Sequence, residues 1–252
     1  MVPGIEKFRE HFAGHEDSYA LIGGAACALI FEEVGLEFRA TRDVDMVLCV
    51  EVVDPSFGTA LKGFLDAGQY EARERGAERR EFYRFHKPKD TSYPEMLELF
   101  SSPEAGVDLE VGDELATVAI SDDMLSLSAI LLDKDYYDAL INSRRPVDGI
   151  HVLDERLLIP FKARAFVDLT RRRAEGDAKI KGSDIAKHRR DVFRLLQLLN
   201  REETVEVNEP LKDDLRAYRD ILKDDGTFHP PDFGVDIERS ESFELLTALY
   251  VL

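Results

Sequence analysis

The sequence predicts an α+β protein, with a mixed β-sheet and flanking helices in residues 1–153 and a helical part in residues 154–252. In the first part, apolar runs of strand length such as 19–22 and 94–102 are interspersed with segments of helical length. In the second part, apolar residues recur at helical spacing. The turn signal Asp148-Gly149, followed by a short strand, marks the soft boundary between the two parts.

The stretch from Tyr19 to Val50 carries the main functional signal. A short apolar run is followed by Gly23-Gly24, a helix-length apolar segment and then a strand with Asp43 and Asp45. Residues two apart in a strand point to the same face, so the two carboxylates project together. A divalent cation would offset their repulsion, and Mg²⁺ is usually held by one or two carboxylates plus substrate phosphates. The glycines let a phosphate approach the backbone at the N-terminus of the next helix.

This order of a glycine pair and TRDVD resembles the signature of the nucleotidyltransferase superfamily with the polymerase-beta-like fold. Within it, the chain is most similar to the bacterial AbiE-type (abortive infection) toxin nucleotidyltransferases. The resemblance implies that residues 1–153 form a nucleotidyltransferase core. It also implies that Gly23 and Gly24, with Thr41 or Arg42, hold the phosphates of a nucleoside triphosphate.

A third carboxylate is expected from a later strand next to the one that bears Asp43 and Asp45. Glu98 lies between Leu97 and Leu99, so it is an acid among apolar neighbours that needs a partner. In the family that the chain resembles, Glu98 matches the position of the third metal ligand best. Asp108 is the reserve candidate.

The resemblance reappears in the helical part. Lys162 and Ala165 resemble one family motif, and Arg190-Asp191 resembles the motif on the next helix. The resemblance implies that Lys162 counters the charge of the triphosphate, with Lys187 and Asp191 as supporting residues. The alternatives are a solvated surface lysine at 162 and a local ion-pair ladder along the second helix.

Several other segments have structural explanations. Residues 1–18 are expected to form an amphipathic helix whose His11 and His15 lie on a solvated face. Two strands joined near Gly76 are expected within residues 70–85, with the arginines of this stretch at solvated strand edges. Asp133 and Asp135 repeat the spacing of the first acidic pair, but a helix end or turn explains them. The arginines within residues 70–85 are Arg73, Arg75, Arg79, Arg80 and Arg84.

Two helix starts are predicted in the C-terminal part. Proline suits the first position of a helix, so a regular helix is expected from Pro160 to about Gly176. Ser183 is expected to cap the following helix, with Asp184 favourable in its first turn.

Composition limits the possible partners. The net charge of −18 excludes a general nucleic-acid coat, because phosphate neutralisation supplies most non-specific affinity. A local basic face for RNA and an acidic surface for a basic partner stay open. No apolar run approaches the roughly 20 residues that span a bilayer, so no membrane partner is expected. Cys27 and Cys49 are expected to be small core residues in a reducing compartment, and we expect a cytoplasmic protein.

We therefore expect a Mg²⁺-dependent transferase that moves a nucleoside monophosphate from an NTP to an acceptor hydroxyl. Asp43 and Asp45 would hold two metal ions, and Glu98 would hold the one near the acceptor, where its carboxylate can also help deprotonate the attacking oxygen. Basic residues around Gly176 suggest an RNA 3′ end as the acceptor, and the toxin-like resemblance implies an antitoxin protein as a partner. These basic residues are Arg171, Arg172, Arg173, Lys179, Lys181, Lys187, His188, Arg189 and Arg190.

Two other classes stay open. A small-molecule nucleotidyltransferase of the antibiotic-modifying kind would need a deep polar acceptor pocket. A catalytically idle module would keep the fold and recognise a nucleotide or a partner protein. The structural alternative to an RNA-binding face is that the basic residues form ion pairs with the surplus of acidic residues.

Overall fold

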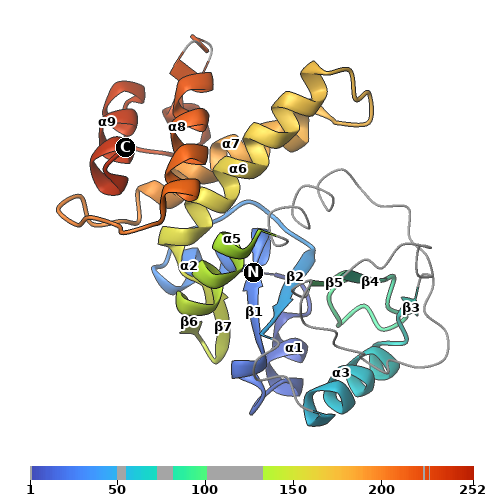
Figure 1. Ribbon diagram of the computed structural model, residues 1–252. Coiled ribbons are helices and arrows are strands. Elements are labelled where there is room, and N and C mark those ends of the chain that lie inside the picture. Colours follow the sequence, from blue (N-terminus) through green and yellow to red (C-terminus); the bar gives the residue numbers. More distant parts are fainter. Residues whose placement is uncertain (1, 50–54, 73–81, 101–132, 224, 227) are drawn as a thin grey trace. The chain divides into compact units, whose positions relative to one another are not determined.

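A computed structural model of the chain describes residues 2–49, 55–72, 82–100, 133–223, 225–226 and 228–252 (Figure 1). These residues form two compact units. The first contains the described residues up to 100 together with 140–153, and the second contains 133–139 and 154–252. One division between the units follows residue 153. The earlier segment 133–139, however, belongs to the helical unit.

The first unit is built on a mixed sheet, as the sequence predicted. The described strands follow the order β3-β4-β5-β2-β1-β7-β6. The β2–β5 and β1–β7 pairs are parallel, and the other neighbours are antiparallel. The strands are β1 (Tyr19–Ile22), β2 (Asp43–Leu48), β3 (Glu71–Ala72), β4 (Phe82–His86), β5 (Met96–Phe100), β6 (Arg144–Val147) and β7 (Ile150–Leu153).

Aromatic side chains join the N-terminal helix to the sheet. The helices of this unit are α1 (Ile5–His11), α2 (Gly23–Glu33) and α3 (Pro55–Gly68), with a 3₁₀ turn at Glu16–Ser18. Phe8 contacts Phe12 and Phe64, with ring centroids 4.6 and 5.9 Å apart, and the edge of Tyr19 at 5.4 Å. These rings are fully buried and fasten α1 and α3 to β1.

The helix expected over residues 1–18 is shorter than predicted. It begins after Gly4 and is followed by Gly14, both with positive φ, and such backbone does not continue a helix. His11 is not on a solvated face, because its Nε2 lies 2.7 Å from the carbonyl oxygen of Ala60. His15 packs its ring against Phe57.

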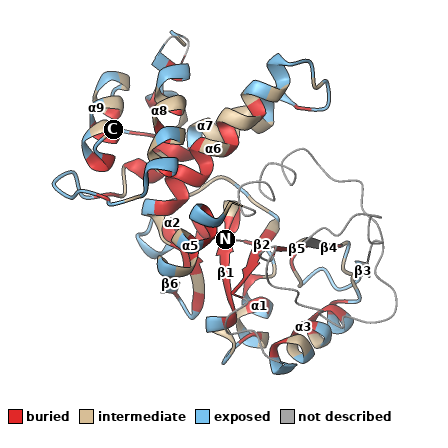
Figure 2. Ribbon diagram, viewed as in Figure 1, coloured by how far each residue is buried: buried red, intermediate tan, exposed pale blue. Residues whose placement is uncertain are grey.

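The helix α2 is buried along most of its length. Gly24 to Phe31 are all enclosed, and β1 beside it is buried at every position (Figure 2). A helix that is apolar all round belongs in the interior. The turn from β1 into α2 is therefore held in place by a buried strand before it and a buried helix after it. Cys27 and Cys49 are both buried, as expected of small core residues.

The second unit is helical in its described part. The long helices α6 and α7 pack against each other, and α8 packs on α6. No helix in the described parts of the chain is both long and apolar enough to cross a membrane. The helix α5 (Lys134–Asn142) begins in the second unit and ends in the first. The other elements of the second unit are α6 (Glu155–Ala174), α7 (Gly182–Leu196), α8 (Glu209–Lys223), a 3₁₀ turn at Pro230–Phe233 and α9 (Arg239–Tyr250).

The helix α6 begins before Pro160, which corrects the predicted start. Asp154 caps it, accepting a hydrogen bond from the backbone N–H of Arg156 at 2.7 Å. Pro160 therefore lies inside the helix, where it leaves the carbonyl of Arg156 without its usual N–H donor. The hydroxyl of Tyr250 donates to that carbonyl at 2.6 Å. Because Tyr250 is fully buried, its pKa is raised and the hydroxyl keeps its proton.

Two further helix starts are resolved. The helix α7 begins at Gly182 after Lys181, so Ser183 lies within the first turn and is not the cap. Asp133 precedes α5, and its carboxylate accepts from the backbone N–H of Asp135 at 3.1 Å. The other oxygen of Asp133 accepts from Arg164 at 2.8 Å. Asp133 is thus a structural acid at a helix start.

Candidate functional site

The acidic row of the first unit lies where β2 and β5 run in parallel. Asp43 is opposite Met96 and Asp45 is opposite Glu98. Paired residues of neighbouring strands present their side chains on the same face, and so do residues two apart in one strand. Asp43, Asp45 and Glu98 therefore share one face of the sheet.

Glu98 is enclosed, as its apolar neighbours predicted, with 6% of its surface exposed. Burial raises the pKa of Glu98 well above its ordinary value, and the charge of Asp45 and a hydrogen bond to it act in the same direction. Arg84 on β4 opposes that rise. Its Nε donates to Oε1 of Glu98 at 2.6 Å, and its Nη2 contacts the same oxygen. Arg84 is thus a half-buried ion-pair partner, not the solvated strand-edge residue that the sequence predicted.

Gly23 lies directly against the carboxylate of Asp45. It opens α2 with φ +68°, and a Cβ built on it would lie 2.0 Å from Oδ2 of Asp45. Any side chain at this position would collide with the acid, and only glycine adopts such backbone without strain. The first glycine of the pair is therefore required by the Asp45 carboxylate.

Gly24 lies beside Thr41 and Arg39. A Cβ on Gly24 would be 2.7 Å from Oγ1 of Thr41 and 3.5 Å from an Nη of Arg39. A hydroxyl and a guanidinium thus accompany the N-terminus of α2, where backbone N–H groups favour an anion. Arg42, in contrast, forms an exposed ion pair with Glu95, with 3.2 Å between Nη1 and Oε2.

The carboxylates of this site supply part of the ligand set that a divalent cation needs. Asp45 and Glu98 are hydrogen-bonded to each other, and Asp43 lies on the same face of β2. One or two carboxylates with substrate phosphates are the usual protein ligands of Mg²⁺. Among the described residues, no three His, Cys, Asp or Glu side chains converge closely enough to hold a metal between them. The reserve candidate Asp108 lies outside the described residues.

Lys162 belongs to the second unit and is not a solvated surface lysine. It is 5% exposed on α6, and its Nζ lies 3.3 Å from Oδ2 of Asp191 on α7, which is fully buried. Asp191 thus pairs with a residue of the neighbouring helix. Arg194, the last member of the alternative ladder, donates to the carbonyl of Phe233 at 3.1 and 3.2 Å. Lys187 lies half-buried on α7.

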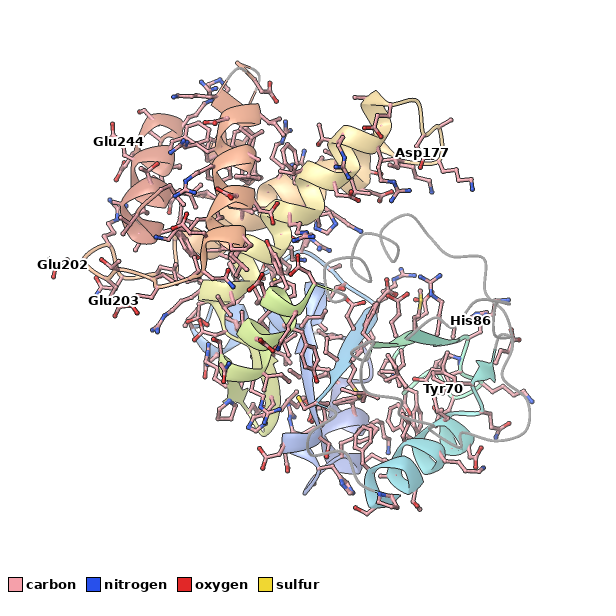
Figure 3. The ribbon with its side chains drawn as sticks, viewed as in Figure 1. Tyr70, His86, Asp177, Glu202, Glu203 and Glu244 are labelled. Atoms are coloured by element: carbon pink, nitrogen blue, oxygen red, sulfur yellow. The ribbon has the colours of Figure 1, made fainter. Side chains whose placement is uncertain are left out.

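The basic stretch around Gly176 is partly neutralised by local acids. Arg171 pairs with Asp168 at 2.9 Å, and Arg172 pairs at 2.8 Å with Asp177, which Figure 3 labels in the turn after α6. Arg189 pairs with Asp225 at 2.8 Å. The exposed basic residues of this stretch include Lys179, Lys181 and Arg190.

Two basic residues beside the acidic row were not singled out from the sequence. Arg84 follows Phe82-Tyr83 in a strand of alternating character, and its contact with Glu98 depends on the pairing of β4 with β5. Arg39 stands two residues before Thr41, close to the glycine turn. The sequence signal for Arg84 was the apolar context of Glu98, which required a positively charged neighbour.

The comparisons with known proteins give a structural likeness but no match of sequence. No protein-family model matches the sequence, and no curated protein matches it. Among solved structures, the chain resembles the crystal structure of an antigenic nucleotidyltransferase-like protein from Paracoccidioides brasiliensis, with a TM-score of 0.47. The two are 16% identical, over 99% of this chain and 97% of that chain.

Proposed function

We propose that the protein is a Mg²⁺-dependent nucleotidyltransferase that moves a nucleoside monophosphate from an NTP to an acceptor hydroxyl. The observation that carries the proposal is the row of acids beside the glycine turn. Asp45 contacts Glu98 across β2 and β5, and Gly23 lies against the Asp45 carboxylate. This arrangement places negative charge for a cation next to backbone N–H groups for phosphates.

Each residue has a defined part in this proposal. Asp43, Asp45 and Glu98 would hold Mg²⁺, which would neutralise charge on the phosphates and make the acceptor hydroxyl easier to deprotonate. The backbone of Gly23 and Gly24, with Thr41, receives the β- and γ-phosphates. Glu98 accepts the proton of the attacking hydroxyl. Lys162 counters the charge of the triphosphate.

The acceptor is proposed to be an RNA 3′ end, guided by Arg171–Arg173 and Lys187–Arg190, as in a toxin of the AbiE type with an antitoxin partner. The ion pairs of Arg171, Arg172 and Arg189 reduce the charge left for RNA. That observation favours the second candidate, a nucleotidyltransferase with a small-molecule acceptor. An idle nucleotide-binding module is the third.

The test is transfer from each labelled NTP with Mg²⁺ and either total RNA or a panel of hydroxylated small molecules. Asp45→Asn should abolish transfer, because it preserves the shape of the side chain and removes the charge that holds the cation. Circular dichroism should show an intact fold. Asp66→Asn, which changes a surface carboxylate paired with Lys62, is the matched control and should transfer normally. Transfer by Asp45→Asn at the wild-type rate would refute the proposed function.

A further inference from the structure

Arg84, Glu98 and Asp45 form a row across three neighbouring strands. Arg84 is opposite Glu98 in the β4–β5 pair, and Glu98 is opposite Asp45 in the β5–β2 pair. The Arg84 and Glu98 side chains are 14% and 8% exposed. Glu98, which is itself enclosed, therefore lies between a guanidinium and a carboxylate.

The charges in this row do not balance without Arg84. Two neighbouring carboxylates with little solvent repel each other unless a proton or a cation joins them. The guanidinium supplies a fixed positive charge to Glu98 through two contacts with one oxygen. A group of this kind stabilises an acid pair when no metal is present.

The same guanidinium opposes a divalent cation at this place. A cation on Asp45 and Glu98 would lie within a few ångströms of Arg84, and like charges at such separations repel strongly where water is scarce. Glu98 also has only two oxygens, and Arg84 already holds Oε1. The metal and the guanidinium are thus rivals for one carboxylate.

We propose that Arg84 is the counter-ion of Glu98 in the metal-free protein. Binding of a divalent cation at Asp43 and Asp45 then breaks part of the contact between Arg84 and Glu98. The inference rests on the proposed function for the identity of the rival cation. Glu98 stays with Arg84 until a cation is present. The protein without nucleotide therefore binds divalent cations weakly, and the phosphates of the NTP supply the missing ligands.

The test is Arg84→Met, which removes the charge and keeps an unbranched apolar stem. Mn²⁺, added alone, is titrated by electron paramagnetic resonance into the full chain, and thermal melts are recorded with and without Mn²⁺. The variant should bind Mn²⁺ about tenfold more tightly, because a positive charge near the site has been removed. Its Tm should be lower than wild type in EDTA, and the difference should shrink when Mn²⁺ is added.

Arg145→Met is the matched control. Arg145 is also a half-buried arginine of the same sheet, on β6, and pairs with Glu33 at 2.8 Å. This variant should lower Tm equally with and without Mn²⁺ and leave Mn²⁺ affinity unchanged.

Four outcomes would overturn the inference. Unchanged or weaker Mn²⁺ binding by folded Arg84→Met shows that Arg84 supports the metal site and does not compete for it. If Arg84→Met does not fold, Asp45→Asn added to it should restore the fold by removing the repulsion, and failure to do so also contradicts the inference. If neither wild type nor Arg84→Met binds Mn²⁺ even with NTP, the proposed function fails as well. Mn²⁺ binding by wild type with NTP, without tighter binding by Arg84→Met, overturns the inference alone.

Discussion

At the residue scale, the two glycines of the pair are required for different reasons. Gly23 is required by its positive φ and by the Asp45 carboxylate, which a Cβ would overlap. Gly24 is required less strictly, because its nearest neighbour is the end of the Thr41 side chain, which can rotate. The phosphate-binding role expected for both glycines thus depends on a turn that must leave room for the Asp45 carboxylate.

Lys162 belongs to the same scale, and its burial changes how its role must be tested. Lys162→Met takes the ammonium group away from the fully buried Asp191 carboxylate, which costs about 3–5 kcal/mol of unfolding free energy. Lys162→Met combined with Asp191→Leu should recover most of that loss, because both charges are gone. NTP affinity should be low in both variants if Lys162 binds the triphosphate.

The two quantities are measured by urea denaturation and by calorimetric titration with NTP. A double variant that regains wild-type NTP affinity would show that Lys162 serves only the α6–α7 contact. Arg216→Met, which changes a partly exposed arginine of α8 paired with Glu209 and Asp213, is the control for loss of a positive charge.

At the element scale, α6 is continuous through a proline because a residue from the end of the chain replaces the missing donor. Pro160 removes the hydrogen bond to the Arg156 carbonyl, and the Tyr250 hydroxyl donates to it at 2.6 Å. The helix that carries Lys162 therefore depends on α9. Local sequence could not show this, because the two partners are distant in the chain.

Tyr250→Phe should destabilise the protein by about 1–3 kcal/mol, because the part-buried hydrogen bond to the Arg156 carbonyl is lost while the ring still packs. In a Pro160→Ala background, the restored backbone N–H reaches the same carbonyl, and the cost of Tyr250→Phe should fall to a few tenths. Denaturant unfolding of the four proteins of this cycle measures the coupling. Equal costs in both backgrounds would show that the hydroxyl does not substitute for the helix bond.

At the scale of the whole molecule, the net charge of −18 restricts RNA binding to a local basic face. Because Arg172 and Arg189 are ion-paired, the better test reverses the exposed residues Lys179, Lys181 and Arg190 to Glu. Transfer to RNA should be lost and NTP binding retained.

Wild-type RNA binding should also weaken steeply between low and physiological salt, which filter binding over a salt series measures. Lys62, Lys87 and Lys134 reversed to Glu carry the same charge change elsewhere on the surface and form the control. Equal loss in both triple variants would mean that net charge, not this stretch, governs RNA binding, and no loss in either would favour a small-molecule acceptor.

The sequence by itself determined the local features of this protein. The apolar run 19–22, the glycine pair and the strand with Asp43 and Asp45 could be predicted because each depends on neighbours a few residues away. The mixed sheet and the helical second part followed from the same patterns. The exact starts of α1, α6 and α7 did not, since a cap or a breaker competes with the apolar pattern at helix ends.

Only the tertiary structure decided which charged groups meet. The register of β4, β5 and β2 brings Arg84 to Glu98 and Glu98 to Asp45, and strand pairing between distant segments is not encoded in local spacing. The pairing of Lys162 with Asp191 depends in the same way on how α6 packs on α7. Burial makes each of these pairs consequential, because a charge removed from water requires its partner.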